Sequence, residues 1–246
     1  MSPLDTDHQR VADYYDRHYH AGATVGQPGH DLHRLARRLQ IEPGLRVLDI
    51  ACGTGEWLAV LASMGAVVSG IDISTRAVEV CRQRLPEGIF ETGPAETLPF
   101  PTQGFDIVTC MGSLEHFLDQ PCALREMIRV ARPGGRVLIL VPNAGFLPYR
   151  LGLYHGTQQQ AIRETIRSLP ELGVDAQGSR SRGGIPLARP ACSRPPVDRP
   201  VPVVDGARSR FTGTPVAYLA NRLAVPGAFR LSRPHRLRTF VMSVHR

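Results

Sequence analysis

A strand that runs into a glycine-containing turn is the part of this chain best suited to bind a ligand. Residues 47–55 are Val-Leu-Asp-Ile-Ala-Cys-Gly-Thr-Gly, and a helical pattern follows them. Small residues at Ala51, Gly53 and Gly55 let the backbone turn tightly and approach a ligand without Cβ clashes. The helix N-terminus then offers free N–H groups to ligand oxygens. This arrangement is typical of a nucleotide site at the end of a first strand, although a similar turn can be purely structural.

An acidic residue at the end of the next strand supports a nucleotide site. Asp72 closes the run Gly70-Ile71-Asp72 and follows Gly55 by 17 residues. An acid at this spacing can accept hydrogen bonds from both ribose hydroxyls of an adenosine. Its alternative role is to cap the following helix, although Ser74 or Thr75 is also available for that. We favour the ribose role because the glycine turn and the acid occur together.

The elements that position these residues alternate regularly from about residue 45 to residue 169. Short aliphatic runs predict strands at residues 46–51, 67–71, 89–91, 106–110 and 136–141. Helical patterns lie between them at residues 56–64, 75–84 and 122–130. This alternation predicts an α/β fold, a Rossmann-like doubly wound and mostly parallel sheet with helices on both faces. Helical spacing at residues 11–19 and 30–39 predicts a helical lid over residues 1–44.

Five ordered blocks of this α/β region resemble class I S-adenosylmethionine-dependent methyltransferases. The resemblance covers roughly residues 10–170 and is greatest to the small-molecule branch with the ubiquinone and menaquinone methyltransferases. The blocks are residues 47–55, residues 70–72, Leu98-Pro99-Phe100-Pro101 with residues 105–108, Leu114-Glu115-His116, and Arg132-Pro133-Gly134-Gly135. The resemblance implies that residues 45–171 form the cofactor-binding domain.

The resemblance implies S-adenosylmethionine as the cofactor and a set of residues that contact it. These residues are Asp49, Ala51, Gly53, Gly55, Asp72, Ile73, Ala95, Glu96, Cys110 and Met111. Asp49 is expected to orient the methionine end, Asp72 to bind the ribose and Ile73 to pack on the adenine. Ala95 and Glu96 are expected to line the adenine pocket.

Two positions depart from the pattern of the family. Ala51 stands where many members have glycine, a change that we expect to need only a little more room. Pro94 stands where many members carry an aspartate that accepts a hydrogen bond from the adenine amine. Because proline cannot do this, adenine recognition is expected to rest on the Ala95 backbone and on Glu96.

Catalysis and acceptor binding are assigned to one histidine and three tyrosines. His116 follows the fourth strand, near the methyl position by analogy, and is the candidate general base for an oxygen or nitrogen acceptor. Its alternative is a helix-terminal histidine bonded to its own backbone. Tyr14, Tyr15 and Tyr19 lie in the lid and are candidate acceptor contacts, or they pack the lid itself. The apolar residues 142–154 favour a hydrophobic or aromatic acceptor, methylated at oxygen, nitrogen or carbon.

No metal site is expected. His18 and His20, with His30 and His33, lack a third anchoring cysteine or carboxylate, so we interpret them as part of a solvated loop. The sequence also lacks a cluster of acidic residues that would predict a magnesium site.

Two other functions compete with methyl transfer. An NAD-dependent dehydrogenase would carry Gly-x-Gly-x-x-Gly, but Leu58 occupies the third glycine position. A methyltransferase-fold protein that binds the cofactor without turnover, acting as a partner or scaffold, is the other alternative.

Charge and composition restrict the partners and the location. The net charge is +7, but residues 1–170 hold 16 arginines and 18 acidic residues. Residues 171–246 hold 13 arginines and 4 acidic residues, so the excess positive charge lies in the last third of the chain. The arginines of that last third lack the aromatic interleaving of a nucleic-acid platform, so no nucleic-acid partner is expected. No apolar run is long enough to span a membrane, and the polar start of the chain lacks a secretory signal. Five scattered cysteines predict reduced thiols and a cytoplasmic protein. The oligomeric state is not defined by the sequence.

The last third of the chain, residues 172–246, is predicted to be an irregular tail rich in arginine and proline. A complete fold of this class needs two more strands after a helix at residues 158–169, and no hairpin pattern is present there. One interpretation is a one-base insertion near Glu171 that shifted the reading frame. With one base dropped, the codons from Leu172 onward permit Trp-Glu-Ser-Met-Leu-Lys-Ala-Ala-Gly-Leu-Glu-Val-Glu-Ser-Leu-Trp, a helix leading into a strand. A natural disordered tail is the alternative.

Overall fold

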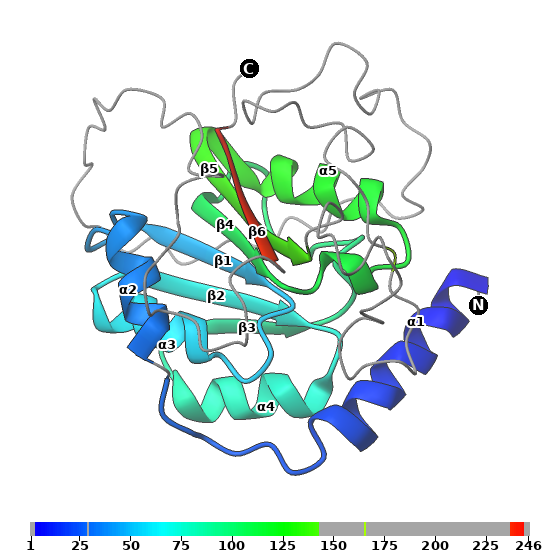
Figure 1. Ribbon diagram of the computed structural model, residues 1–246. Helices are drawn as coiled ribbons and strands as arrows, with labels where there is room; N and C mark the ends of the chain where they lie inside the picture. The colour runs from blue at the N-terminus through cyan, green and yellow to red at the C-terminus, as the bar shows by residue number, and fades with distance from the viewer. Residues whose placement is uncertain (1–2, 29, 143–164, 166–236, 244–246) are drawn as a thin grey trace, which may run out of the picture.

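The computed structural model describes residues 3–28, 30–142, 165 and 237–243, and it is built on one six-stranded sheet (Figure 1). The strand order is β3-β2-β1-β4-β5-β6. Five strands run parallel and the edge strand β6 runs antiparallel to β5. The strands are β1 (Arg46–Ile50), β2 (Val67–Asp72), β3 (Ile89–Thr92), β4 (Phe105–Met111), β5 (Ala131–Pro142) and β6 (Leu237–Ser243). The predicted α/β class and all five predicted strands are confirmed.

Helices cover both faces of this sheet. They are α1 (Pro3–Tyr14), α2 (His30–Arg38), α3 (Glu56–Ser63), α4 (Thr75–Arg84) and α5 (Gln120–Val130). Two of them begin at side chains that cap free N–H groups. Ser74 accepts from the N–H of Ala77 at 3.0 Å at the start of α4, and Asp119 accepts from the N–H of Cys122 at 2.9 Å at the start of α5. Both residues do what short polar side chains do at helix N-termini.

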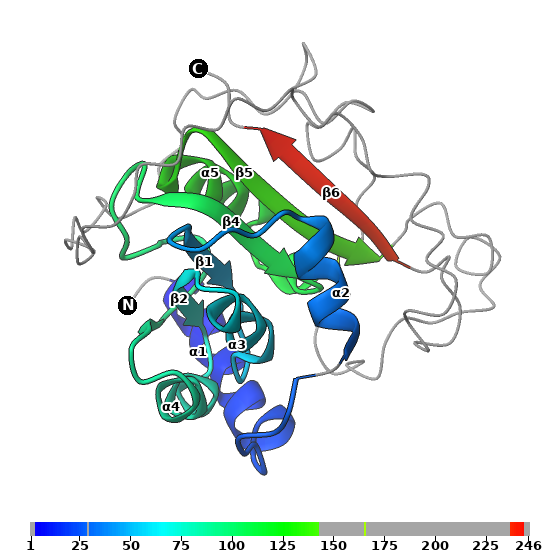
Figure 2. The same ribbon diagram turned by 90° about the vertical axis from the view of Figure 1, so that its left-hand side faces the viewer.

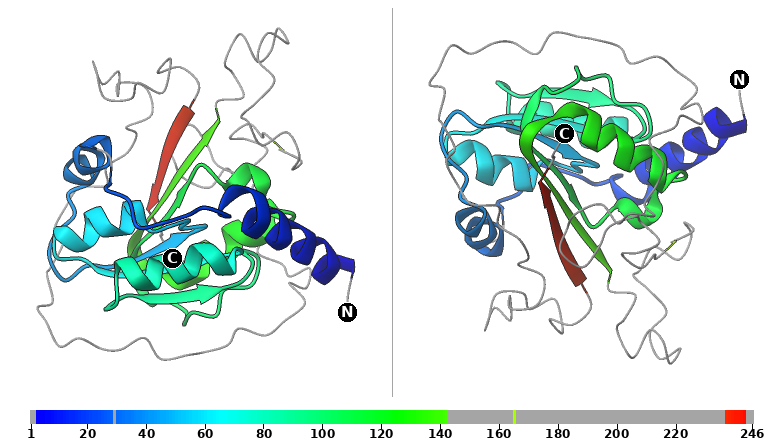
Figure 3. Two further views of the ribbon diagram at one scale, coloured as in Figure 1. Left: turned by 90° about the horizontal axis from the view of Figure 1, so that it is seen from below. Right: turned by 90° about the horizontal axis from the view of Figure 1, so that it is seen from above.

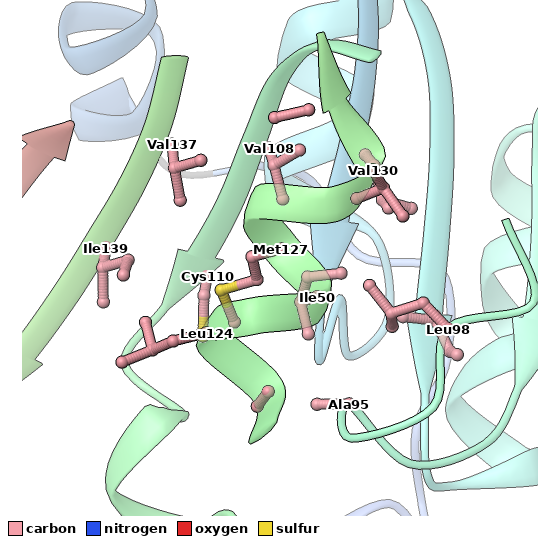
Figure 4. Close-up of a cluster of buried hydrophobic side chains, with 14 of the residues drawn as sticks. Ile50, Ala95, Leu98, Val108, Cys110, Leu124, Met127, Val130, Val137 and Ile139 are labelled. Carbon is pink, nitrogen blue, oxygen red and sulfur yellow. The ribbon is translucent and has the colours of Figure 1, made fainter. Parts of the chain in front are cut away.

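The alternation of side chains along the strands divides the core into two layers. Val47 of β1 packs with α2, α3 and α4 on one face, whereas the next residue, Leu48, packs with α5 on the other. Figure 4 shows Met127 and Leu124 of α5 lying over Val108 and Cys110 of β4. Figure 2 shows α2 and α5 on opposite sides of the strands. Burial on both faces explains why these strands are almost uniformly apolar.

Two elements differ from the sequence prediction in their bounds. The lid helix α1 begins at Pro3 and gives way at Tyr15 to a π-helical turn, η1 (Tyr15–Tyr19), so the predicted helix at residues 11–19 is wrong in its start and type. Strand β5 begins at Ala131, earlier than predicted. Ala131 pairs with Phe105 and Arg136 with Ile107, so residues 132–135 form a bulge between two paired stretches, with Gly134 at φ +75°.

The predicted irregular tail contributes one strand, which corrects the prediction for residues 237–243. β6 pairs antiparallel with β5 over seven residue pairs, from Arg136 with Ser243 to Pro142 with Leu237 (Figure 3). The open edge of β5 offers unpaired N–H and C=O groups to any extended segment that reaches it. This pairing depends on a partner about one hundred residues away, so no local period announces it. The predicted helix at residues 158–169 lies outside the described residues except for Thr165, which is in neither a helix nor a strand.

Two predictions concern thiols and membranes. Cys52, Cys81 and Cys110 are free, but Cys122 is disulfide-bonded, so the expectation of five reduced thiols is wrong at that residue. Within the described part of the chain, no helix has the length and apolar character needed to cross a membrane. The cytoplasmic location stays a prediction.

Candidate active site

A cavity of about 440 Å³ opens at the carboxyl ends of β1, β2 and β4, beneath the N-terminal segment. Parallel strands end at one edge of the sheet, and this edge is where α/β sheets bind their ligands. Eleven of the fourteen residues predicted from the sequence line it: Asp49, Ala51, Gly53, Asp72, Ile73, Ala95, Glu96, Met111, His116, Tyr15 and Tyr19. Residues separated by up to a hundred positions therefore meet in one place, as the motif analysis predicts.

The other three predicted residues do not line the cavity. Gly55 has φ +76° and precedes α3, and a Cβ there would lie 2.8 Å from the Sγ of Cys81, so it packs the turn against α4. Cys110 is fully buried in the core beneath α5. The ring of Tyr14 stacks on that of His18, with centroids 5.1 Å apart. Gly55 and Cys110 therefore pack behind the site, and Tyr14 packs within the N-terminal segment.

The turn after β1 has left-handed backbone at two positions that face the cavity. Gly53 has φ +54°, and a Cβ built on it would meet only His20, at 3.9 Å, so the space before it is open. Ala51 has φ +57°. Its replacement of glycine therefore strains the backbone, which corrects the expectation that alanine there needs only more room.

Asp72 joins the ends of the first two strands. Its Oδ2 accepts the backbone N–H of Gly53 at 2.8 Å, and its Oδ1 accepts that of Ser74 at 2.9 Å. Burial raises the pKa of Asp72, and these two N–H donors partly offset the effect. Each carboxylate oxygen can accept more than one hydrogen bond. Asp72 thus fixes the glycine turn and keeps acceptor capacity for a ligand.

Asp49 is a buried acid whose environment disfavours its charge. Its Oδ1 accepts the Thr109 hydroxyl at 2.6 Å, and Trp57 donates its indole N–H to the same hydroxyl at 3.3 Å. Burial raises the pKa of Asp49 to about 7, the Thr109 hydrogen bond lowers it, and the charge of Asp72 raises it further. A cationic group placed in the cavity would favour the ionised form.

Glu96 is bound on both of its oxygens. The backbone N–H of Asp119 donates to Oε1 at 3.0 Å, and Nε2 of His8 lies 3.2 Å from Oε2. Burial raises the pKa of Glu96, but the His8 and Asp119 contacts outweigh it, so that the pKa lies below its usual value. Glu96 is therefore an anion at neutral pH, held in place by the lid helix on one side and by the start of α5 on the other.

The N-terminal segment is fastened to the cofactor side of the sheet. Asp16 accepts the Ser74 hydroxyl at 2.5 Å and the backbone N–H of Arg76 at 3.1 Å, both at the start of α4. Arg84, at the other end of α4, donates to the carbonyl of Gly26 at 2.6 Å and to that of Thr54 at 2.7 Å. The lid is thus closed over the turn by specific contacts, none of which the sequence analysis identified.

Besides His8, two further histidines line the cavity. His116 ends the short 3₁₀ turn η2 (Leu114–His116) after β4 and is 9% exposed. His20 follows the π-helical turn and is 7% exposed. The prediction that His20 belongs to a solvated loop is wrong, because the rings of Tyr15 and Tyr19 and the glycine turn cover it. No local pattern marks this burial, since it depends on residues more than thirty positions away.

Comparison with known proteins finds similarity to methyltransferases. A family model described as a methyltransferase domain matches residues 48–139. A demethylmenaquinone methyltransferase of Beutenbergia cavernae is 36% identical over 179 residues, which are 68% of this chain and 74% of that protein. A ubiquinone/menaquinone biosynthesis C-methyltransferase of Ectopseudomonas mendocina is 44% identical over 124 residues, 44% of this chain and 48% of that protein. A 27-O-demethylrifamycin SV methyltransferase of Amycolatopsis mediterranei is 39% identical over 121 residues, 45% of this chain and 44% of that protein.

Solved structures show only a partial likeness. The YcgJ protein of Bacillus subtilis is 33% identical, with a TM-score of 0.43, over 47% of this chain and 51% of that chain. The [4+2]-cyclase SpnF is 28% identical, with a TM-score of 0.48, over 56% and 62% of the two chains. The chain also spans only about half the length of the Ectopseudomonas and Amycolatopsis relatives.

Proposed function

This chain belongs to the S-adenosylmethionine-dependent methyltransferases, and we propose that it methylates a small apolar or aromatic acceptor in the cavity beneath its lid. When bound, the cofactor supplies an electrophilic methyl group on a sulfonium. The chain's own task is to hold cofactor and acceptor in line and, for an oxygen or nitrogen acceptor, to remove a proton.

The charge of the cavity is the observation that carries this proposal. Four carboxylates line it, Asp49, Glu56, Asp72 and Glu96, and among the described lining residues there is no arginine. A cofactor with a sulfonium, an ammonium and one carboxylate is a net cation, and such a cavity favours it. A nicotinamide dinucleotide carries a pyrophosphate, for which the described lining offers no arginine or lysine. The charge of the cavity and the presence of Leu58 at the third glycine position both argue against a dehydrogenase.

The residues divide the tasks along the cavity. Asp49 would hold the methionine ammonium and Asp72 the ribose, while Ile73 and Ala95 would bracket the adenine. Glu96 would fix the far edge through its contacts with His8 and Asp119. These roles are the ones that the family resemblance implies, and the fact that all five residues line one cavity supports them.

The acceptor is proposed to lie beyond the methyl group, against apolar side chains. Val11 and Leu32 of the N-terminal segment and Met111, Phe117 and Leu118 after β4 line the cavity. His116 stands among the latter and is the proposed base. Names of relatives refer to demethylmenaquinone and to 27-O-demethylrifamycin SV, and the first of these is an aromatic quinone. Of the apolar residues 142–154, all but Pro142 lie outside the described part of the chain.

Two measurements test this function. Calorimetry with S-adenosylhomocysteine and with NAD should show binding of the first and none of the second. Incubation with S-adenosylmethionine and panels of quinols, phenols and small acids should then give a methylated product, detected by mass spectrometry. Tighter binding of NAD contradicts the family role, and cofactor binding without any methylated product supports the non-catalytic alternative.

A further inference from the structure

We propose that His20 binds the carboxylate of the cofactor's methionine end, a role that rests on the proposed function and is assigned from its place against the glycine turn. The histidine comes from the lid and the turn from the sheet. Closure of the N-terminal segment would therefore complete the cofactor site.

The side chain of His20 is fixed but has ring nitrogens to spare. Its backbone N–H donates to the carbonyl of Tyr15 at 2.7 Å, and its ring packs against those of Tyr15 and Tyr19, with centroids 6.1 and 4.8 Å away. In the described part of the chain, no hydrogen bond joins its ring nitrogens to another group. The ring nitrogens of His20 are not among the buried polar atoms that lack a partner, so they are accessible from the cavity that the residue lines and can meet a ligand there.

The position of His20 next to the glycine turn indicates that it would contact the methionine end of the cofactor. Among the described residues, apart from the chain neighbours of Gly53, a Cβ on Gly53 would approach one atom within 4 Å, the Cε1 of His20. The ring and the turn are therefore adjacent walls of the cavity. Asp49, proposed to hold the methionine ammonium, lies on the strand that leads into this turn. The carboxylate of the same amino acid would thus lie near both the turn and His20.

The other two cationic candidates on the wall are assigned to other parts of the cavity. Besides His20, the basic residues lining the cavity are His8 and His116. His8 contacts Glu96, the residue expected at the adenine, and His116 lies after β4. Backbone N–H groups of the turn and the Thr54 hydroxyl can share the carboxylate, and His20 adds a donor from the lid side. Asp72 and Asp16 oppose the effect of burial on the pKa of His20, which is lowered overall. A neutral imidazole still donates one N–H to a carboxylate.

A pair of ligands tests this assignment. S-adenosylhomocysteine carries the amino-acid end, and 5′-methylthioadenosine lacks it. In His20→Ala we expect binding of S-adenosylhomocysteine to weaken by about tenfold to a hundredfold, the range for a hydrogen bond to a charged group. Binding of methylthioadenosine should change less than about twofold. His20→Gln keeps a donor and should restore part of the loss.

The neighbouring histidine provides the control. His18 is exposed, two residues away, and bonds to the carbonyl of Tyr14, so His18→Ala should leave both affinities unchanged. Equal weakening of both ligands in His20→Ala would indicate a structural role and overturn the proposal, as would no weakening at all. If the native chain binds neither ligand, the proposed function fails first.

Discussion

The Oδ2 of Asp72 lies 2.8 Å from the backbone N of Gly53, so the end of β2 holds the turn that follows β1. The two strands are neighbours in parallel register, with Asp49 opposite Gly70 and Ile50 opposite Ile71. Their carboxyl ends are therefore adjacent, and one carboxylate can fix the turn and face the cavity at once. The residue expected to bind ribose is also the residue that shapes the loop.

Replacing Asp72 with alanine should weaken the binding of S-adenosylhomocysteine. The ribose hydroxyls would lose a charged acceptor and the Gly53 N–H its partner, and we expect a loss of about 1–3 kcal/mol. Calorimetry on the folded variant measures it. Asp7→Ala is the control, because Asp7 is an exposed aspartate of α1 that does not line the cavity. Unchanged affinity in folded Asp72→Ala would remove the ribose assignment.

Asp49 should make the ligand-free chain less stable as the pH rises. Its folded pKa of about 7 lies above the ordinary aspartate value of 3.8. Its stabilising effect is therefore present in full below about pH 4 and is lost as the pH rises to about 7. A pKa difference of about three corresponds to about 4 kcal/mol, an upper limit here.

The matched variant Asp49→Asn tests this, because the amide keeps an oxygen that accepts the Thr109 hydroxyl. At pH 8 the free energy of unfolding of this variant, measured by denaturant titration, should exceed that of the native chain by roughly 1–4 kcal/mol. The difference should disappear by pH 4. The variant should also bind S-adenosylhomocysteine more weakly. A gap independent of pH would show that the carboxylate is not strained by burial.

Ala51→Gly should stabilise the protein. A non-glycine residue in the left-handed region costs about 1–2 kcal/mol, and the entropy lost by glycine on folding offsets part of the gain. We expect a net increase of about 1 kcal/mol in the free energy of unfolding, measured by denaturant titration. Ala59→Gly, inside α3 with ordinary helical backbone, should instead lower it by about 1 kcal/mol. If Ala51→Gly and Ala59→Gly lowered the free energy of unfolding by similar amounts, the backbone at Ala51 would not be strained.

His116→Ala should lower kcat by about 10²-fold on an oxygen or nitrogen acceptor, because the proton then lacks a positioned base. Affinity for S-adenosylhomocysteine should stay within about twofold, since His116 is assigned to the acceptor. His33→Ala, a histidine of α2 that does not line the cavity, is the control. Full activity of the His116 variant would leave it a structural residue.

The parts of the site that the sequence predicts are those with local patterns. The apolar run before Ala51 defines β1, and the acid that closes the next run defines the end of β2. Parallel strands then bring Asp49 and Asp72 to one edge without further information. Physical reasoning from patterns works here because strand, turn and helix are adjacent in the chain.

What the sequence did not predict depends on contacts across long separations. His20 is buried by a turn more than thirty residues later, and Asp16 caps a helix 58 positions away. Likewise, the pKa of Asp49 follows from burial beside Thr109, 60 positions away in the chain. Hydrophobic periodicity contains none of these relationships, because it reports only which face of an element is buried.

The last third of the chain leads to a prediction about its gene. We propose that a one-base insertion near Glu171 changed the reading frame of residues 172–246. The fold class closes with two further strands, and the described residues of this region contribute one, β6 at the edge of β5. The basic composition changes at the same place, with 13 arginines and 4 acidic residues after residue 170. One strand at an open edge can form from any extended segment, so β6 does not require a native tail.

The nucleotide sequence around codon 171 decides the question, and expression of a corrected gene extends it to the protein. With one base removed, codons from Leu172 should encode the helix-and-strand pattern that begins Trp-Glu-Ser-Met-Leu-Lys, with a stop codon across the codons of Met242 and Ser243. The corrected chain loses residues that now form β6, so it must provide its own closing strands. Because those strands would bury more apolar surface, its unfolding midpoint should rise, with S-adenosylhomocysteine binding retained. Early stop codons in the shifted frame, or a corrected chain less stable than the present one, would show that the tail is native.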